Sequence, residues 1–238
     1  MTPLLPLAVL DRVIDLALEE DAARGDVTTS LTIDPGARGV AHAETREQIV
    51  VAGLDVFART FTRVDPSVQV EPLVQDGATV GPRAHLALVR GPVAAILMGE
   101  RVALNLLQRM CGIATTTAAF VEAARRGGKA RVVDTRKTTP GLRVLERYAV
   151  RCGGGLNHRE DLGSGVLIKD NHVAACGGVG PAVAKARAHA PHPLKIEVEV
   201  STLAELDEAI ARTGVDVISA GALTHSVRAA DIALELHA

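Results

Sequence analysis

From about residue 106 onward, short apolar runs rich in β-branched residues alternate with segments of helical periodicity. This alternation constrains the fold most strongly, because it predicts parallel strands with helical connections, in a sheet that is open or closed into a barrel. The predicted strands are 131–134, 165–168, 195–200 and 215–219, and the predicted helices are 182–190 and 203–212. Polar residues follow each strand, at the position where barrel enzymes carry their chemistry.

The first 105 residues follow a different rhythm. Alternating polar and apolar residues at 38–44 and 48–52 predict strands, and Gly and Pro residues mark the turns between elements. The N-terminal stretch predicts an amphipathic helix. The residues on its apolar side are Val9, Val13, Ile14, Leu16 and Ala17. We therefore expect an α+β region first and an α/β region after it.

Composition excludes several classes of protein. The chain has 238 residues, of which 47% are hydrophobic and 23% charged, as is typical of a globular protein. No apolar run approaches the roughly 20 residues of a membrane-spanning helix, and the N-terminus lacks the features of a signal peptide. The three cysteines form no CxxC pair, so neither a zinc site nor a disulfide framework is indicated, and a cytoplasmic location fits best. Because complete GxGxxG and GxSxG motifs are missing, NAD binding and acyl-enzyme chemistry have no support.

Charge is distributed unevenly. Between residues 125 and 159 lie ten Lys or Arg residues and two acidic residues, a local net charge of +8 in a chain whose net charge is −2. The overall charge argues against a nucleic-acid surface, and only 2% of the residues are aromatic, which leaves few rings for stacking bases. A local positive field concentrates small anions. The alternative is a solvated basic helix face with no binding role.

Two segments at the predicted strand ends carry cations. In DTRKTTPGLR, Arg136 suits bidentate contact with a carboxylate or phosphate, and Lys137 offers a point charge. In GGGLNHR, the glycines allow a ligand to approach the backbone closely, and His158 and Arg159 add hydrogen-bond donors. Surface charge without a ligand is the alternative interpretation of Arg136 and Lys137.

Two further strand ends add another lysine and a pair of carboxylates. Lys169 begins the sequence KDNH directly after a strand. For His172, in the same sequence, a purely structural role is the alternative to a catalytic one. In EVEV, alternation puts Glu197 and Glu199 on one face, where a barrel interior or a metal could use them. A solvent-exposed edge is the alternative for both, and a metal or ribose role is favoured for Glu199 only.

The last strand end is the turn SAGALTHS, which contains Gly221 and His225. Such a turn after a final strand is a usual position for a phosphate held by backbone N–H groups. Several cations, one or two carboxylates and a phosphate turn together predict a site for a multiply charged anion and a magnesium ion. This indicates phosphoryl or phosphoribosyl chemistry, and the residue types alone do not decide between them.

The stretch DTRKTTPGLRVLERYAVRCGGGLNHR, followed by KDNH, EVEV and GVDVISAGALTHS, closely resembles the quinolinate phosphoribosyltransferase family. The segments ALEEDAARGDVTTSLT, IVVAGLDVF and ERVALNLLQRMCGIATTT extend the resemblance over nearly the whole chain. It implies an α/β fold, with an N-terminal α/β sandwich domain at 1–105 and an incomplete, open TIM-like α/β barrel at 106–225. It also implies that residues 226–238 pack back on the first domain, and that the active sites of a homodimer or dimer-based oligomer are shared between subunits.

The resemblance implies transfer of a phosphoribosyl group from phosphoribosyl pyrophosphate to quinolinate, with Mg²⁺ as cofactor. Decarboxylation then gives nicotinate mononucleotide, a precursor of NAD. It implies no nucleic-acid or membrane partner. The residues implied for quinolinate's carboxylates are Arg136, His158, Arg159 and, across the dimer interface, Arg101. Those implied for the donor and the reacting centre are Lys137, Lys169, Glu199 (ribose hydroxyls or Mg²⁺), Gly221 and His225 (5′-phosphate).

The sequence departs from the family pattern after EVEV. The family continues to one strand ending in Leu-Asp-Asn and another ending in Ser-Gly-Gly, whereas here EVEVSTLAELDEAIAR leads directly to TGVDVISAGALTHS. Roughly one to two βα units of about 30 residues each are absent, so the barrel is truncated after about residue 212. We expect exposed sheet edges, weakened donor binding and reduced activity.

Three functional hypotheses follow. The first is the quinolinate enzyme, and the second is a related pyrophosphorylase with another substrate, against which the intact DTRKT and NHR motifs argue. The third is a catalytically weak paralogue that serves as a dimer partner or ligand-binding subunit. The missing Leu-Asp-Asn and Ser-Gly-Gly motifs favour the third hypothesis, and the complete set of quinolinate-binding residues argues against it.

Overall fold

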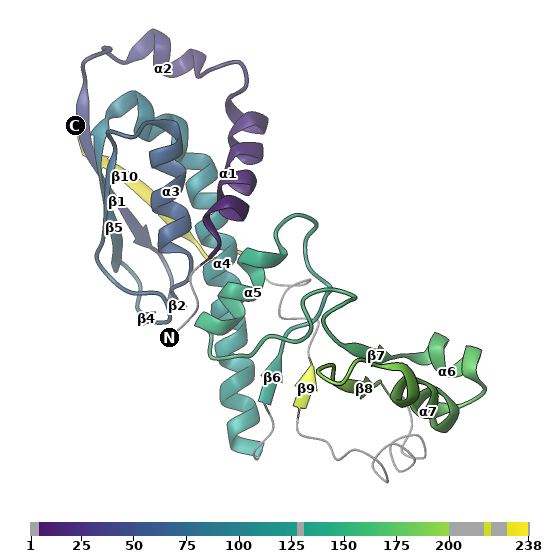
Figure 1. Cartoon of the computed structure of the whole chain (residues 1–238). Coiled ribbons are helices and arrows are strands. Elements are labelled where there is room, and N and C mark those ends of the chain that lie inside the picture. The colour runs from purple at the N-terminus through teal and green to yellow at the C-terminus, as the bar shows by residue number, and fades with distance from the viewer. Residues whose placement is uncertain (1–4, 128–130, 200–216, 220–227, 238) are drawn as a thin grey trace. The chain divides into compact units, whose positions relative to one another are not determined.

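The computed structural model describes residues 5–127, 131–199, 217–219 and 228–237. The chain divides into two compact units (Figure 1). The larger unit comprises Met1–Asn157 and Ser219–Ala238, and the smaller unit comprises His158–Ile218. The domain boundary predicted at residue 105 lies inside helix α4 (Val93–Gly127) and stays a prediction.

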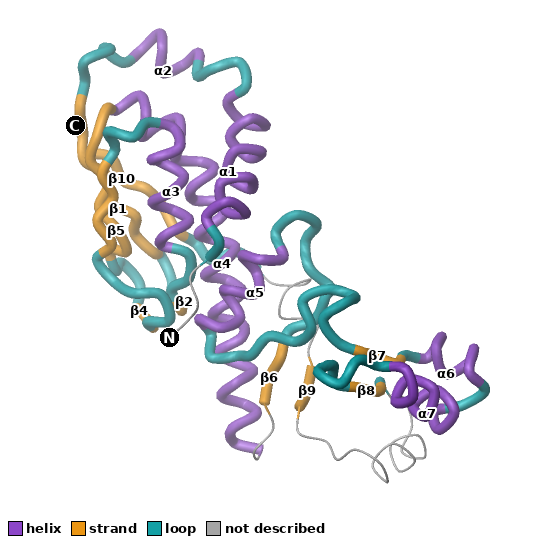
Figure 2. Tube along the Cα trace, in the orientation of Figure 1, coloured by secondary structure: helices purple, strands orange, loops and turns teal. Residues whose placement is uncertain are grey.

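The larger unit is built on an antiparallel sheet with the strand order β10-β1-β5-β3. Its strands are β1 (Arg38–Thr45), β3 (Gln69–Pro72), β5 (His85–Pro92) and β10 (Ile232–His237). Successive side chains of a strand point to opposite faces, and in β1 this alternation buries Ala41, Ala43 and Thr45. Helices α3 (Leu54–Val64) and α4 cover the buried face (Figure 2).

Strand β10 comes from the C-terminal end of the chain and lies beside β1, with Val40 opposite His237. Gln108 of α4 holds the approach to this strand. Its carbonyl accepts a hydrogen bond from the Ala230 N–H (2.9 Å), and its Nε2 donates to the Ile232 carbonyl (2.7 Å). The last strand of the chain therefore completes the sheet of its first hundred residues.

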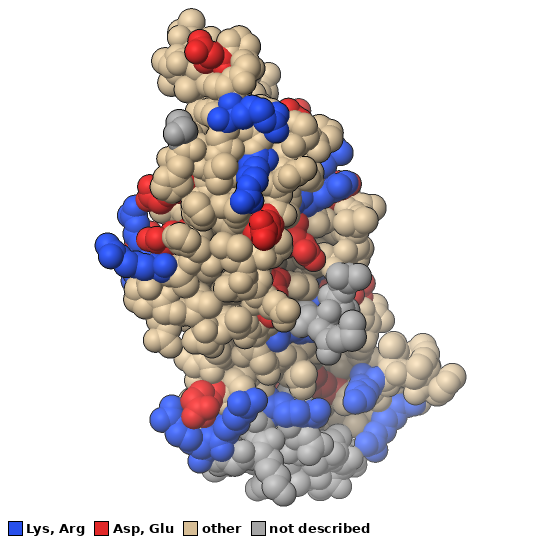
Figure 3. Space-filling model, turned by 90° about the vertical axis from the view of Figure 1, so that its left-hand side faces the viewer, with Lys and Arg blue, Asp and Glu red and all other residues tan. Residues whose placement is uncertain are grey.

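No described helix covers the other face of this sheet. Figure 3 views the molecule from that side and shows side chains of both charges there. Arg90 Nη1 lies 3.2 Å from Glu71 Oε2, and Arg46 Nη2 lies 4.0 Å from Glu235 Oε1. These pairs are exposed, so each contributes little to stability.

Helix α1 (Leu7–Ala22) packs through Leu10 and Ile14, its two buried residues. The predicted apolar side was wrong for Val9 and Leu16, which are 42% and 58% exposed. Leu10, which the prediction omitted, is buried instead, and the adjacent Val9 therefore points toward solvent. Shorter elements complete the larger unit: α2 (Val27–Thr32), β2 (Ile49–Val50), β4 (Thr79–Val80), β6 (Arg131–Val133) and α5 (Arg143–Cys152).

A second apolar cluster of the larger unit joins α1, α4 and α5. Its fully buried side chains include Ile14, Met110, Ile113 and Leu145. Burying a side chain of this size contributes about 1.5–3 kcal/mol. This cluster holds α5, which follows the DTRKTTPG segment, against the long helix α4.

The smaller unit pairs β7 (Val166–Ile168) with β8 (Ile196–Val198) in parallel, so two of the predicted strands are confirmed at reduced length. Helices α6 (Asp170–Cys176) and α7 (Val179–His189) follow β7, and α7 contains the predicted helix 182–190 almost entirely. Over residues 158–199, the buried core of this unit consists of Ile168, Val179, Ala182 and Val183.

The fold is mixed α/β, as predicted, and has an N-terminal sheet region followed by a strand–helix region. Over the described residues it contains no closed barrel. Strand β9 (Val217–Ser219) lies within the predicted strand 215–219, whereas the predicted helix 203–212 falls outside the described residues. Among the described helices, none has the length and hydropathy that crossing a membrane requires.

Candidate active site

A buried carboxylate follows strand β6. Asp134 is fully buried, and its N–H donates to the Leu156 carbonyl at 3.1 Å. The Leu156 N–H donates in turn to the Val132 carbonyl at 2.9 Å, so Leu156 lies parallel to the strand. The backbone therefore ties the DTRKTTPGLR segment to the GGGLNHR segment.

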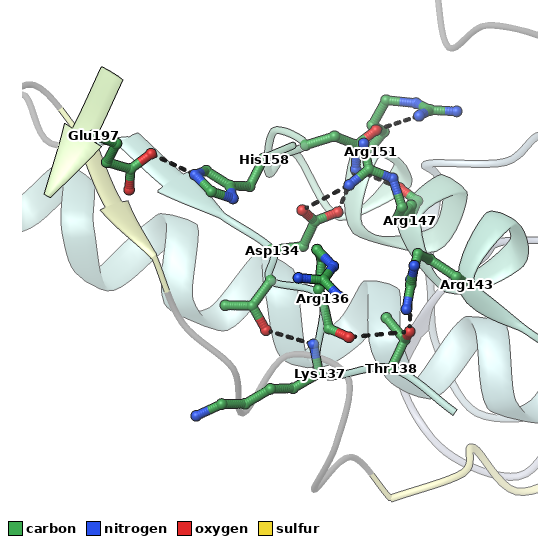
Figure 4. Close-up of polar contacts among 11 residues, drawn as sticks. Asp134, Arg136, Lys137, Thr138, Arg143, Arg147, Arg151, His158 and Glu197 are labelled. Atoms are coloured by element: carbon green, nitrogen blue, oxygen red, sulfur yellow. Dashed lines mark hydrogen bonds and ion pairs between the residues drawn. The ribbon is translucent and has the colours of Figure 1, made fainter. Parts of the chain in front are cut away.

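Helix α5 presents Arg143, Arg147 and Arg151 at intervals of four residues, which places them on one face of the helix. Figure 4 shows their side chains next to the groups that they contact. Arg143 Nε donates to Thr138 Oγ1 at 3.1 Å, and Arg147 Nη1 lies 3.3 Å from Asp134 Oδ1. Because Arg147 is only 9% exposed, the alternative of a solvated basic helix face does not hold for it.

Asn157 connects the third arginine of this face to the buried carboxylate. Its Oδ1 accepts a hydrogen bond from Arg151, and its Nδ2 donates to Asp134 Oδ2 at 2.6 Å. Burial lowers the pKa of Arg151 below its usual value. The guanidinium is nonetheless charged at any physiological pH, so its hydrogen bond to Asn157 is charge-assisted.

A second ion pair, with a buried carboxylate, holds the middle of the DTRKTTPGLR segment. Glu146 of α5 is 1% exposed, and its Oε1 accepts from Arg109 Nε at 2.8 Å and from Arg109 Nη2 at 2.5 Å. The Thr139 Oγ1 accepts from the same Nη2 at 2.5 Å, while the Thr139 N–H donates to Glu146 Oε2 at 3.2 Å. Residues 134–139 of the segment are thus fixed at both ends, at Asp134 and at Thr139.

Arg136 and Lys137 lie between these two fixed points. The half-buried Arg136 has an Nε without a hydrogen-bond partner among the described residues. Lys137 is exposed and extends away from Asp134 (Figure 4). Since buried donors in proteins are normally paired, the Arg136 guanidinium is suited to an anionic ligand.

Two glycines of GGGLNHR have a packing role that the sequence did not predict. A Cβ at Gly153 would lie 2.3 Å from the Ala114 carbonyl oxygen, and one at Gly155 would lie 2.8 Å from Thr117 Cγ2. Close approach to helix α4 is therefore required at both positions, and the approach of a ligand stays a prediction.

In the smaller unit, His158 and Glu197 form one polar pair. His158 Nε2 contacts Glu197 Oε2, and the carboxylate of Glu197 is 48% exposed (Figure 4). Arg159 Nη1 donates to the Gly165 carbonyl at 3.0 Å. The sequence predicted no partner for Glu197, so this pairing is new.

Lys169 and Glu199 form the second pair. Lys169 Nζ lies 2.7 Å from Glu199 Oε2, with the two side chains 39% and 59% exposed. The Lys169 N–H donates to His172 Nδ1 at 3.1 Å, so the ring of His172 caps helix α6 as a structural histidine would. An exposed ion pair contributes about 0–1 kcal/mol, so either group can exchange its partner for a ligand at little cost.

Comparison with known proteins bears on both regions of the chain. A model of the N-terminal domain of quinolinate phosphoribosyltransferase matches residues 26–111, and a model of the C-terminal domain matches residues 113–213. The chain belongs to the quinolinate phosphoribosyltransferase family. It is 45% identical to a probable nicotinate-nucleotide pyrophosphorylase (carboxylating) of Synechocystis over 92% of this chain and 73% of that protein. The crystal structure of NadC from Streptococcus pyogenes matches at a TM-score of 0.91 and 35% identity, covering 100% of this chain and 99% of that one.

The comparison also supports the predicted internal deletion. The nicotinate-nucleotide pyrophosphorylase of Mycobacterium leprae is 40% identical over an alignment of 270 residues, which covers 92% of this chain and 94% of that protein. An alignment of 270 residues is longer than this chain of 238, so it contains positions at which this member of the family has no residue.

The family resemblance had assigned nine residues to the active site, and the structure places seven of them. Lys169 and Glu199 are brought together, whereas Arg101 is exposed on α4. Gly221 and His225 lie outside the described residues. Among the described residues, no three His, Cys, Asp or Glu side chains converge as a protein-built metal site requires.

Sequence reasoning missed the residues that hold the two cationic segments in place. These are Arg109, Asp134, Glu146, Arg147, Arg151 and Asn157. One signal was present, because arginines four residues apart on a short helix lie on one face. Nothing in the sequence identified their partners.

Proposed function

We propose that this chain transfers the phosphoribosyl group of phosphoribosyl pyrophosphate to quinolinate. The pyridine nitrogen attacks C1 of the ribose, and the bond from C1 to the pyrophosphate oxygen breaks. The carboxylate next to the ring nitrogen then leaves as CO₂, and its electron pair stays on the ring carbon until a proton arrives. The products are nicotinate mononucleotide, pyrophosphate and CO₂, a step in NAD biosynthesis.

The observation that carries this proposal is the Arg136 guanidinium, held between two fixed loop ends with an unpaired buried Nε, in a chain that matches both domains of the family. Quinolinate carries two carboxylates, and a planar guanidinium can bind a carboxylate through two parallel hydrogen bonds. His158, Arg159 and, from the partner subunit of a homodimer, Arg101 are the further proposed contacts of these carboxylates.

The donor is proposed to use the lysines and the remaining carboxylate. Lys137 and Lys169 contribute point charges for its phosphates, and Glu199 accepts hydrogen bonds from the ribose hydroxyls or binds magnesium. Magnesium is usually bound by one or two carboxylates together with substrate phosphates, so a single glutamate suits a metal that arrives with the donor. Gly221 and His225 are the proposed contacts of the 5′-phosphate. The cytoplasm stays the expected location.

A direct test is magnesium-dependent formation of nicotinate mononucleotide, followed by chromatography together with CO₂ release from carboxyl-labelled quinolinate. Arg136→Lys keeps the charge but removes the planar fork, so we expect the KM for quinolinate to rise about 10- to 100-fold. Arg24→Lys, at an exposed position between α1 and α2, is the matched control and should leave the kinetics unchanged. An Arg136→Lys enzyme with wild-type KM would contradict the proposed quinolinate contact.

The weak paralogue remains as a second candidate, because the alignment with the Mycobacterium protein contains positions that this chain lacks. Ligand-induced thermal stabilisation separates the two, since a ligand that binds only the folded state raises Tm. Stabilisation by quinolinate and by phosphoribosyl pyrophosphate supports the enzyme. Stabilisation by quinolinate alone, without turnover, supports the paralogue.

Shared active sites can be tested by mixing two inactive variants. Arg101→Ala and Lys137→Ala each remove a residue proposed to come from a different subunit of the same site. In a mixed dimer, one of the two sites then contains neither substitution. Activity that reappears on mixing supports sharing, whereas two variants that stay inactive after verified subunit exchange argue against it.

A further inference from the structure

Asn157 directly precedes His158 and Arg159 in the sequence, and its side chain uses all of its hydrogen-bonding groups. Nδ2 donates to Asp134 Oδ2 at 2.6 Å and to the Arg147 carbonyl at 2.9 Å. Oδ1 accepts from Arg151 Nη1. A carboxamide has two N–H donors and one carbonyl acceptor, so these three contacts use both donors and the acceptor.

The partners of Asn157 are themselves fixed. Asp134 is fully buried and also contacts Arg147, whereas both arginines belong to helix α5. That helix is tied to the N-terminal region through Tyr148, whose hydroxyl donates to Asp76 Oδ2 at 2.8 Å. Asn157 is therefore anchored to a buried carboxylate and a packed helix.

No other side chain of similar size can make the same three contacts. An aspartate would place a second carboxylate beside Asp134 and leave the Arg147 carbonyl without a donor. A serine is too short to reach all three partners. Leaving a buried carbonyl unsatisfied is destabilising, and leaving a buried carboxylate unsatisfied is more so because it is charged.

We propose that Asn157 is a positioning residue for quinolinate binding. Its carboxamide sets the point from which His158 and Arg159 extend, and it fixes this point relative to Asp134, two residues before Arg136. The carboxamide thereby fixes the start of the segment that carries His158 and Arg159, the proposed contacts of the dicarboxylate. This inference rests on the proposed function and assigns Asn157 no contact with substrate.

Asn157→Asp is the most specific substitution, because it replaces the Nδ2 donor group by an acceptor oxygen with almost no change of shape. Calorimetric titration with quinolinate should show an affinity about 10- to 100-fold weaker than that of the wild type, as for a small misplacement of binding groups. The KM for phosphoribosyl pyrophosphate should change much less. Gln69→Glu, the same chemical change at an exposed position of the edge strand β3, is the control and should bind quinolinate like the wild type.

The double variant Asp134→Asn/Asn157→Asp exchanges donor and acceptor and keeps the net charge of the pair. It should recover part of the quinolinate affinity, because the interaction between the two side chains is restored in the opposite direction. A purely structural contribution to stability predicts no such recovery of affinity in variants that are already folded. If Asn157→Asp does not fold, Asn157→Ser carries the same test without the added charge.

The outcomes separate this inference from the proposed function. If the wild type binds no quinolinate, the proposed function fails and the inference fails with it. If the wild type binds quinolinate and the folded Asn157→Asp variant binds it equally well, only the inference is overturned. Weaker binding that the double variant partly restores supports both.

Discussion

The two units of this chain differ in how much apolar surface they bury. The larger unit has two clusters, and its fully buried side chains include Phe57 and Phe61. Among its described residues, the smaller unit has four buried hydrophobic residues, including Ile168 and Val183, which pack against a pair of three-residue parallel strands. Parallel strands normally occur in larger sheets that are covered on both faces, and a region of roughly 60 residues is marginal by itself.

The exposed ion pairs and the buried polar network of the candidate site lie in different units. The exposed pairs of Lys169 with Glu199 and of His158 with Glu197 belong to the smaller unit. The buried network around Asp134 belongs to the larger one. The sequence predicts that the missing family segment follows EVEV, so we expect the deletion to affect the smaller unit more than the larger one.

A cavity in the core of the larger unit should destabilise the protein most, and a cavity in the smaller unit provides the comparison. Phe57→Ala should lower the free energy of unfolding by about 3–5 kcal/mol in urea titrations. Val183→Ala removes two methyl groups and should cost about 1.5 kcal/mol. The two variants can be compared by alkylation, since Cys111 is buried in the larger unit and Cys176 lies in the smaller.

Phe57→Ala should increase the alkylation rate of Cys111, whereas Val183→Ala should increase that of Cys176 alone. Peptide mass spectrometry after brief exposure to iodoacetamide distinguishes the two thiols. If Val183→Ala exposes Cys111 as strongly as Cys176, the two units unfold together and the contrast between them does not hold.

A smaller effect is expected from a buried ion pair of the larger unit. Glu146→Gln leaves the Arg109 guanidinium without its carboxylate, and breaking such a pair costs about 3–5 kcal/mol when both groups are fully buried. Because the Arg109 side chain is 29% exposed, we expect about 2–3 kcal/mol from thermal or urea unfolding. Glu71→Gln makes the same change in the exposed pair with Arg90 and should cost under about 1 kcal/mol. Equal costs would mean that burial does not set the strength of these pairs.

The sequence allowed the strand–helix order to be predicted, because hydrophobic periodicity reports which residues of an element face the core. It did not allow the extent of α4 to be predicted. Gly99 and Gly112 lie inside that helix, and each is explained only by contacts with distant residues. A Cβ at Gly99 would lie 2.9 Å from Phe61 Cδ1, and one at Gly112 would lie 2.1 Å from the Arg228 carbonyl oxygen.

The candidate site shows the same limit. Residue type and resemblance identified Arg136, Lys169 and Glu199, because a charged residue after a strand is visible in the sequence itself. The hydrogen bond from Asn157 to Asp134 was not predictable, because the two residues are 23 positions apart in the sequence. They meet only once helix α5, which lies between them in the chain, has packed.

A third prediction concerns the bond that joins α5 to the N-terminal region. Tyr148→Phe removes the hydroxyl that donates to Asp76, and should cost about 1 kcal/mol of unfolding free energy. Asp76 still accepts from the Gly53 and Leu54 N–H groups at 2.8 Å and 3.2 Å, which limits the loss. A cost as large as that of Phe57→Ala would mean that this one bond determines the docking of the helix.

The same tyrosine should make the larger unit sensitive to alkali. Burial, reinforced by Asp76, raises the pKa of Tyr148 well above its ordinary value of 10.0. The unfolded chain loses this proton near pH 10 while the folded chain keeps it, so the stability is present below pH 10 and is lost as pH rises above it. Tyr148 is the single tyrosine and there is no tryptophan, so tyrosinate absorbance follows the group directly. Ionisation near pH 10 without loss of structure would contradict a raised pKa.

The smallest expected effect lies on the uncovered face of the sheet, where three histidine rings meet. His42 lies between His85 and His237, with ring centroids 4.7 Å and 5.2 Å away. Partial burial lowers the pKa of His42, and the positive charges of both neighbours and of Arg90 lower it further. The folded state therefore binds this proton less readily than the unfolded state, so stability is complete above the ordinary value of 6.5 and falls as pH drops through the lowered pKa.

His42→Gln should make the larger unit less sensitive to acid, with a smaller fall in Tm between about pH 7.5 and pH 5.5 than the wild type shows. His189→Gln, at an exposed position of α7, is the matched control in the smaller unit and should behave like the wild type. Because His42 lies on β1 between β5 and β10, its protonation should loosen the pairing of β10 first, and hydrogen exchange of residues 232–237 should rise before that of α3. Acid sensitivity that persists in His42→Gln and appears first in the smaller unit would reverse this assignment, since the weaker core would then respond to acid before the stronger one.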